Sequence, residues 1–337
     1  MESLKNSDDI KGLDLIIKKK HKVIYRHKQG YNDYNCTRPV SENDLYYLYS
    51  CTKIATVTAC IQQVEAGKIK LDAAVSDYLP EFAHMKVADN FVLGDFGNMP
   101  DQASPTHPAQ TSIRIRDLLA MTAGLSYNTT AEPILELKKK SGNKASTREV
   151  VRAIAQMPLL YEPGTRHAYS LGHDVIAAVI EVVTGQRFSD YIIEHVFHPL
   201  GVHDVYFHLR EEDKGRLADQ YSCDFKTGKK FRHQGNTFEL TDCYDSGGAG
   251  LIATVDGYSA LLDALACGGV GANGNRLLTQ KSIDTMRTPQ LNTVQRDDFT
   301  LKGMFRPGYS YGLGVRVLVD DTKAKSPAGE FGWDGAA

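Results

Sequence analysis

The sequence predicts a protein of the α/β (α+β) class, with strands near the two ends of the chain and helices in the middle. Short strand-like runs lie at residues 13–27, and a clearly alternating run lies at 315–319. Between them, apolar residues recur at helical spacing, most clearly at 174–183. A chain of 337 residues is also long for a single hydrophobic core, so we expect two lobes.

The first predicted elements are a hairpin and a helix. The runs at 13–18 and 22–27 are joined by a basic turn, which predicts an antiparallel hairpin. An aromatic-rich extended run then leads into Ser50, and a helical pattern follows at once. Its apolar positions form one face, at Ile54, Val57, Ile61 and Val64. Gly67 stands where a C-cap would end this helix.

The rest of the chain continues the same alternation of loops, helices and strands. The remaining elements are, in order, a loop-rich stretch at 83–110, a helical turn ended by Gly124, helices at 174–183, 190–197 and 256–266, and a strand at 315–319. No internal repeat or low-complexity segment interrupts them.

Composition excludes several classes of function. The chain has 42% hydrophobic and 24% charged residues with a net charge of −2, which is typical of a globular protein and gives no basic excess for nucleic acid. Residues 1–10 lack the apolar core of a signal peptide, and no run approaches the roughly 20 apolar residues of a membrane span. Six cysteines occur without a C-x-x-C pair. We therefore expect reduced thiols, no membrane partner and a cytoplasmic location.

The stretch from Ser50 to Lys53 carries the candidate chemistry. Ser50 stands at the first turn of the predicted helix, where backbone N–H groups lack partners and the helix dipole is positive. Lys53, three residues later, returns to the same face. A hydroxyl, an amine and the N–H of Ser50 could thus supply a nucleophile, a base and half of an oxyanion hole.

The same spacing has an ordinary structural interpretation. Ser50 could be a simple helix N-cap and Lys53 a solvated side chain. The four-residue motif also recurs at Ser141 and Lys144, in a polar stretch after three consecutive lysines, where we expect a surface loop. The helix context alone leaves both interpretations of Ser50 open.

Several ordered motifs resemble the serine β-lactamase-related hydrolases of the class C type, over nearly the whole chain. The stretches that carry the resemblance are 49–53, 68–72, 78–82, 115–125, 162–165 with 169–170, 198–201 and 246–251. That family includes class C β-lactamases, D-Ala-D-Ala peptidases, D-aminopeptidases and family VIII carboxylesterases. The resemblance implies a β-lactamase/transpeptidase-like fold, with an antiparallel sheet flanked by helices, a mainly helical lobe and the active site between them. The sheet lobe would be residues 1–75 and 240–337, and the helical lobe residues 76–239.

The resemblance also implies roles for three residues. Ser50 would be the nucleophile, Lys53 its amine partner and Tyr169 a phenol that shuttles the proton. An ammonium favours the phenolate form of a neighbouring tyrosine, and burial favours the neutral form of lysine, so either group could accept the proton of Ser50. The ordinary alternative for Tyr169 is a core or surface aromatic. Its position between a Glu-Pro-Gly turn and the helix at 174–183 favours the catalytic interpretation.

Rival motifs fit their contexts less well. Gly308–Gly312 matches a nucleophile elbow around Ser310, but a strand rather than a helix follows it. Lys226–Gly228 spells a β-lactamase motif at what we expect to be a hairpin tip. Asp245 and Ser246 resemble a trypsin-like motif without that family's disulfides, and Cys51 is expected to be an inert small hydrophobe. His195 and His198 lack metal-ligand spacing, so we expect no metal and no cofactor.

Departures from the family pattern bear on the substrate. Leu171 replaces an Asn that hydrogen-bonds an acyl-amide side chain, and His173 could fill part of that space. Trp333, Asp334 and Gly335 align with the family's Lys-Thr-Gly strand. Trp333 removes the cation that would bind a substrate carboxylate, and Asp334 is expected to repel it. Family VIII esterases have a similar Trp-x-Gly.

The end of the chain also differs from the family pattern. The second oxyanion donor would be the backbone N–H of Ala336, beside that of Ser50. The chain stops immediately afterwards, at Ala337, whereas relatives continue, so the sheet lobe is expected to lack its C-terminal end and full activity is in question.

These observations favour a serine hydrolase that forms an acyl-serine intermediate, with a small ester as substrate and carboxylesterase activity. The alternatives are a β-lactamase or D-amino-acid peptidase acting on an amide, or a catalytically weak member kept for ligand binding or regulation. The sequence does not predict the natural substrate or the oligomeric state.

Overall fold

The computed structural model describes residues 11–94, 99–224, 227, 229–233 and 235–335. The strands are β1 (Gly12–Lys19), β2 (Lys22–Gly30), β3 (Tyr46–Tyr47), β4 (Lys86–Ala88), β5 (Thr106–Pro108), β6 (Val205–Tyr206), β7 (Gln220–Cys223), β8 (Lys230–His233), β9 (Ile252–Ala253), β10 (Tyr309–Tyr311), β11 (Arg316–Leu318) and β12 (Phe331–Gly332). The α-helices are α2 (Thr52–Glu65), α3 (Ile115–Leu119), α4 (Glu132–Lys140), α5 (Thr147–Ile154), α6 (Gly172–Thr184), α7 (Phe188–Ile192), α8 (Val255–Ala266), α9 (Gln280–Met286) and α10 (Thr293–Phe299). Short helical turns are η1 (Tyr49–Cys51), η2 (Val75–Asp77), η3 (Pro80–Phe82), the π-turn η4 (Ile193–Phe197), η5 (His198–Leu200), η6 (Glu211–Arg216) and η7 (Asp321–Lys323).

The named strands pair antiparallel, as the predicted class requires. The hairpin expected at 13–27 is β1–β2, and the strand expected at 315–319 is β11, which pairs with β10 and β12. A third sheet has the order β3-β9-β6, and β4–β5 and β7–β8 form small hairpins. Within the described residues these are separate short sheets rather than one continuous sheet, because most strands contain only two to four residues and form few ladder pairs.

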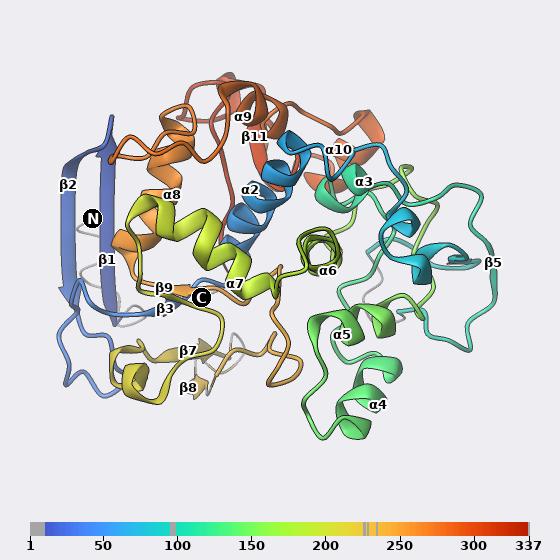
Figure 1. Cartoon of the computed structure of the whole chain (residues 1–337), viewed down its shortest axis with the longest axis horizontal. Helices are drawn as coiled ribbons and strands as arrows, with labels where there is room; N and C mark the ends of the chain where they lie inside the picture. Colours follow the sequence, from blue (N-terminus) through green and yellow to red (C-terminus); the bar gives the residue numbers. More distant parts are fainter. Residues whose placement is uncertain (1–10, 95–98, 225–226, 228, 234, 336–337) are drawn as a thin grey trace.

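Helices α2, α6 and α7 lie between the two ends of the molecule. Figure 1 shows the β1–β2 hairpin with α8 at one end, and α4, α5 and β5 at the other. The segment expected to be loop-rich, 83–110, contains only the short strands β4 and β5 among its described residues. None of the described helices has the length and apolar character needed to cross a membrane.

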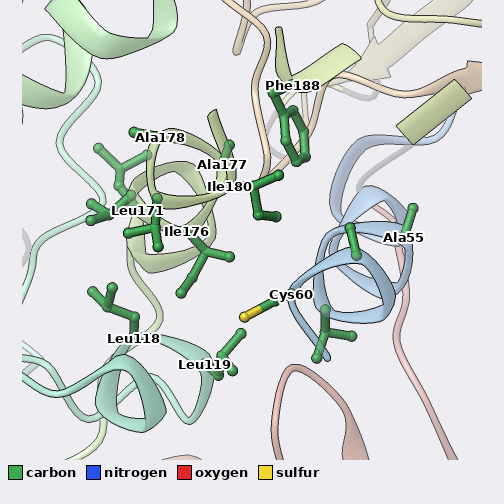
Figure 2. Packing of buried hydrophobic residues seen from close by; sticks show 14 of the residues in the cluster. Ala55, Cys60, Leu118, Leu119, Leu171, Ile176, Ala177, Ala178, Ile180 and Phe188 are labelled. Atoms are coloured by element: carbon green, nitrogen blue, oxygen red, sulfur yellow. The ribbon is translucent and has the colours of Figure 1, made fainter. Parts of the chain in front are cut away.

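Helix α6 forms the centre of the hydrophobic core. Its residues from Gly172 to Ile180 are all buried, and it packs against α2, α3, α5 and α7. Figure 2 shows apolar side chains of α6, such as Ile176, lying between the leucines of α3 and Cys60 of α2. A helix that is apolar on every side is stable only when it is surrounded by protein. The helix ends at Thr184, followed by Gly185 in the left-handed conformation (φ 70°).

A buried ion-pair cluster fixes the segment that follows β8. Asp245 is fully buried and accepts hydrogen bonds from the guanidinium of Arg187, at 2.6 and 2.8 Å, and from His208 Nε2 at 2.8 Å. Burial alone would raise the pKa of Asp245, but the bonds from His208 and Arg187 outweigh it and lower that pKa. The same carboxylate raises the pKa of His208 to about 9. The chain just after Asp245, including Gly248, is therefore held firmly against α2 and α6.

Candidate active site

Ser50 lies at the start of a helix, as predicted, but within a tight turn. It belongs to the 3-10 turn η1, and α2 begins two residues later at Thr52. Tyr49, immediately before it, has a φ of 44°, which is uncommon for a residue with a side chain, and its hydroxyl donates to Gln220 Oε1 at 2.7 Å. This strained, anchored turn keeps Ser50 partly exposed between the buried Tyr49 and the buried start of α2 at Thr52. Helix α2 ends at Glu65, and Gly67 follows with a φ of 71°.

The structure brings Ser50, Lys53 and Tyr169 together. The hydroxyl of Tyr169 donates to Ser50 Oγ at 2.7 Å, and Lys53 Nζ donates to the same oxygen at 3.2 Å. Lys53 is fully buried, its Nζ donates to the carbonyl of Gly248 at 2.7 Å, and it lies 4.7 Å from the centre of the Tyr169 ring. Both candidate bases therefore contact the hydroxyl that would lose its proton, which is the geometry that general-base activation requires.

Tyr127 is a fourth member of this cluster that the sequence did not reveal. Its ring stacks on that of Tyr169 with centroids 5.2 Å apart, and Lys53 Nζ lies 5.7 Å from its centroid. Burial, reinforced by the negative charge of Asp174, raises the pKa of Tyr127 well above its usual value, so this phenol stays protonated and does not serve as a base. Its one sequence signal is its place two residues after the 115–125 motif.

Asp174 is a buried carboxylate behind Lys53 that sequence reasoning also missed. Its Oδ1 accepts hydrogen bonds from three donors, namely the Tyr244 hydroxyl, Ser246 Oγ at 2.7 Å and the Gly248 N–H at 3.1 Å. A Cβ on Gly248 would lie 2.6 Å from Asp174 Oδ2 and 3.4 Å from Lys53 Nζ, so only glycine fits between them. Asp174 thus positions Gly248, the residue whose carbonyl accepts from Lys53.

Removing this carboxylate is expected to destabilise the fold. Asp174→Ala leaves three buried donors without an acceptor, at about 1–3 kcal/mol each, so we expect the free energy of unfolding in urea to fall by at least about 3 kcal/mol. Asp190→Ala is the matched control, because Asp190 occupies the first turn of α7 but is exposed; its effect should stay within about 0.5 kcal/mol. Equal effects of the two substitutions would contradict the role given to Asp174.

The family of the protein follows from comparison with known sequences. A family model described as Beta-lactamase matches residues 1–337, the whole chain. The chain belongs to the Beta-lactamase family. This family comprises serine hydrolases, and both esterases and acyltransferases occur among the relatives of this chain.

Relatives of this Beta-lactamase family member include two esterases. Esterase EstB of Burkholderia gladioli is 28% identical over 346 residues, covering 96% of this chain and 80% of that protein. Lovastatin esterase of Penicillium rubens is 29% identical over 300 residues, covering 84% of this chain and 72% of that protein. Among solved structures, EstCE1, described as a hydrolase with promiscuous acyltransferase activity, has a TM-score of 0.75 at 26% identity over 99% of this chain and 85% of that chain. Simvastatin synthase (LovD) of Aspergillus terreus has a TM-score of 0.74 and confirms the fold. It is 22% identical, and the match covers 95% of this chain and 81% of that chain.

Trp333, one of the three residues predicted to align with the family's Lys-Thr-Gly strand, contacts Tyr169. Trp333 Nε1 donates to the Tyr169 hydroxyl at 3.2 Å, and the two rings stack with centroids 5.7 Å apart. Asp334 does not carry the free negative charge that the sequence suggested. Its carboxylate pairs with Arg306 at 2.7 Å and Arg316 at 2.6 Å. The expectation of simple repulsion from Asp334 is therefore wrong, because two guanidinium groups offset its charge.

Two residues expected to contact substrate lie in the protein interior instead. Leu171 is 4% exposed within the hydrophobic core, as Figure 2 shows, and its N–H donates to the carbonyl of Ser126. His173 is fully buried, and neither ring nitrogen has a hydrogen-bond partner among the described residues. Burial, with a smaller contribution from the charge of Lys53, lowers the pKa of His173 well below its usual value and keeps it neutral. Both side chains therefore lie in the protein interior at the start of α6.

The last predicted site residues are only partly described. Gly335 lies against the turn before Ser50, where a Cβ would come within 2.4 Å of the Leu48 carbonyl oxygen. Ala336 lies outside the described residues. The oxyanion pair formed by the N–H groups of Ser50 and Ala336 therefore stays a prediction.

The rival motifs occupy structural positions, as expected. Ser310 is buried within β10, and Ser246 is occupied by its bond to Asp174. Ser141 caps the end of α4, where its hydroxyl donates to the Lys138 carbonyl at 3.3 Å. Burial raises the pKa of the Cys51 thiol, which disfavours a thiolate nucleophile. The Lys226–Gly228 motif lies largely outside the described residues, between the paired strands β7 and β8.

Proposed function

We propose that this protein is a carboxylesterase that acts on small esters through an acyl-serine intermediate on Ser50. The observation that carries the proposal is the pair of hydrogen bonds to Ser50 Oγ, from Tyr169 at 2.7 Å and from Lys53 at 3.2 Å. A serine hydroxyl becomes an effective nucleophile only when a neighbouring group accepts its proton. Two such groups contact Ser50, and each is held by a further partner.

The reaction follows from these contacts. Ser50 Oγ attacks the ester carbonyl carbon. At the same time its proton passes to the Tyr169 oxygen or the Lys53 amine, whichever of the two groups is unprotonated. The tetrahedral oxyanion then expels the alkoxide, which takes up the transferred proton and leaves as an alcohol. Water next attacks the acyl-serine, gives its proton to the same base and releases the acid, which restores Ser50. The N–H groups of Ser50 and Ala336 would stabilise the oxyanion.

The surroundings of Tyr169 favour a neutral substrate. On the side of Tyr169 that faces β12, the site presents the indole of Trp333 rather than a lysine ammonium. Arg306, which lies over the Trp333 ring, and Arg316 are both paired with Asp334. A substrate carboxylate would thus have to compete with an internal one, whereas an ester with an apolar acyl or aryl group needs no charge partner. The names of Esterase EstB and lovastatin esterase support the same substrate class.

Acyl transfer is a second candidate activity. It shares the acyl-serine step and differs only in that an alcohol replaces water as the second nucleophile. It is favoured by the structural likeness to EstCE1, described as a hydrolase with promiscuous acyltransferase activity. Adding a short alcohol to an ester assay would separate the two activities, because a transferase forms a new ester at the expense of free acid.

The substrate preference gives a direct test. We expect kcat/KM for p-nitrophenyl butyrate to exceed that for nitrocefin by about 10- to 100-fold or more, because a missing charged hydrogen bond costs about 1.5–3 kcal/mol. Asp334→Asn should narrow this ratio, since it frees Arg306 and Arg316 to bind the nitrocefin carboxylate. Nitrocefin turnover equal to that of the ester in the unmodified protein would contradict the proposed preference.

A further inference from the structure

Three side chains able to bind a metal ion meet far from Ser50 in the sequence, where the β1–β2 hairpin touches α8. His21 Nδ1 lies 2.7 Å from Asp263 Oδ2, and Cys267 Sγ lies 3.9 Å from Asp263 Oδ1. The three potential ligand atoms are all within 4.8 Å of one another. Cys267 is a free thiol, so its sulfur is available. No other group of this kind occurs among the described residues.

The local fold presents these side chains to one another from two elements. Lys20 and His21 form the two-residue loop of the hairpin, with φ values of 48° and 68°, as a type I′ turn requires. Such turns favour Asn and Gly, so histidine here adopts a conformation uncommon for its type. Asp263 and Cys267 are four residues apart at the end of α8, which places both on one face of the helix. Figure 1 shows α8 beside β1, and the two elements are in contact.

The contacts of Asp263 hold the turn in place. Its Oδ1 accepts from the backbone N–H of His21 at 3.2 Å, while its Oδ2 faces the imidazole. The side chain of Asp263 is 5% exposed, and that of His21 is 33% exposed. One ligand is therefore anchored in the interior, and the site remains open to solvent on the histidine side, so an ion could enter and keep a water molecule as its fourth ligand.

We propose that His21 Nδ1, a carboxylate oxygen of Asp263 and Cys267 Sγ form a binding site for a zinc ion. Imidazole nitrogen, thiolate sulfur and carboxylate oxygen together suit Zn²⁺, whereas Mg²⁺ and Ca²⁺ prefer oxygen ligands alone. The negative charges of the thiolate and the carboxylate balance the two positive charges of the ion. Three protein ligands with an open fourth position give the tetrahedral coordination that zinc adopts.

Binding requires a change of protonation that can be measured. Cys267 is a free thiol, and an ordinary cysteine, with a pKa of about 8.5, carries its proton at neutral pH. Forming the zinc–sulfur bond breaks the S–H bond, and that proton passes to the buffer. His21 would bind the ion through Nδ1, which replaces the present contact of that nitrogen with Asp263 Oδ2. We expect a net release of about one proton per ion from the thiol.

The site would join the N-terminal hairpin to the helix that supports the candidate active site. On α8, the hydroxyl of Tyr258 donates to the carbonyl oxygen of Cys51 at 3.0 Å, next to Ser50. The ion would bind the folded protein but not the unfolded chain, in which the three ligand residues are far apart. It should therefore raise the melting temperature in a concentration-dependent way and leave the chemistry at Ser50 unchanged.

Cobalt and zinc titrations of the untagged full-length protein test the proposal. We expect one Co²⁺ per chain, with a thiolate-to-cobalt charge-transfer band and the visible bands of tetrahedral cobalt, and displacement of Co²⁺ by one equivalent of Zn²⁺. Cys267→Ser should abolish the charge-transfer band. Losing a residue that only supports a ligand typically weakens metal binding by about 10- to 100-fold, so His21→Gln, which removes a ligand itself, should weaken Zn²⁺ binding by more than that. Calorimetry in two buffers of different ionisation enthalpy should show the released proton.

Two substitutions serve as matched controls. Cys243→Ser removes an exposed free thiol, and His27→Gln removes another histidine of the same hairpin; neither should alter the cobalt spectrum or the zinc affinity. If the unmodified protein binds Co²⁺ and Zn²⁺ no more tightly than folded Cys267→Ser and His21→Gln proteins, the three residues form only a hydrogen-bonded contact and the proposal is wrong. A charge-transfer band that persists in Cys267→Ser and disappears in Cys243→Ser would also overturn it.

Discussion

Replacing Ser50 by alanine is expected to lower kcat for a short-chain aryl ester by on the order of 10⁴-fold or more, because the proposed acyl intermediate forms on the oxygen that this change removes. The substitution removes a single partly exposed oxygen, so the fold should remain intact. Stopped-flow and steady-state assays with p-nitrophenyl acetate would measure the loss. We expect this loss because Tyr169 and Lys53 both hydrogen-bond the Ser50 hydroxyl, which the substitution removes.

The chain supplies a matched control for this experiment. Ser141 and Lys144 repeat the spacing of Ser50 and Lys53, but Ser141 lies at the exposed end of α4 and bonds only nearby backbone atoms. Ser141→Ala should therefore leave kcat unchanged. Ester hydrolysis at the parental rate by Ser50→Ala, with rates confirmed on purified folded protein, would remove Ser50 as the nucleophile.

The second large effect is expected from Lys53 and Tyr169 acting as one unit. Tyr169→Phe keeps the stacked ring but removes the oxygen bonded to Ser50, and Lys53→Met fills the same buried space without the amine. Each should slow acylation by about 10²–10⁴-fold, the usual range for a general base. Because the two groups share one proton acceptor function, the double variant should lose far less than the product of the single losses.

A double-mutant cycle on pre-steady-state acylation measures this coupling. Lys144→Met, in the surface copy of the motif, is the control and should have no effect, as it touches neither Ser50 nor Tyr169. Losses that multiply fully would show that Lys53 and Tyr169 act independently. A Tyr169→Phe protein that acylates at the parental rate would assign proton transfer to Lys53 alone.

The site could be predicted from sequence where its geometry is local or follows motif order. Ser50 and Lys53 are three residues apart at a helix start, so helical phase alone brings them together. Tyr169 is 119 residues away from Ser50, and only its place in an ordered set of motifs identified it. The hairpin at 13–27 was equally predictable, since a two-residue turn fixes the pairing of its strands.

The residues that sequence analysis misplaced or missed have one physical cause in common. Separation along the chain reveals neither the direction in which a side chain points nor its partners from distant parts of the sequence. Leu171 and His173 are close to Tyr169 in sequence, but the first turn of α6 points them into the core. Asp334 meets Arg306 and Arg316, 28 and 18 residues away, and these contacts cancel its expected repulsion.

Two further groups of residues were missed for the same reason. Asp174 reaches Lys53 only through the peptide of Gly248, which lies 74 residues along the chain from that carboxylate. His21 and Asp263 are separated by 242 residues, so no spacing in the sequence could have suggested a metal site.

The central claim is that Ser50 is an activated nucleophile, and labelling with a fluorophosphonate probe tests it most directly. The Ser50 oxygen would displace fluoride from phosphorus and retain the phosphonyl group, which intact-mass spectrometry detects without knowledge of the natural substrate. We predict one adduct per chain, located on Ser50 by peptide mapping, present in Ser141→Ala and absent from Ser50→Ala. An unlabelled parent protein, or an adduct that persists in Ser50→Ala, would contradict the account.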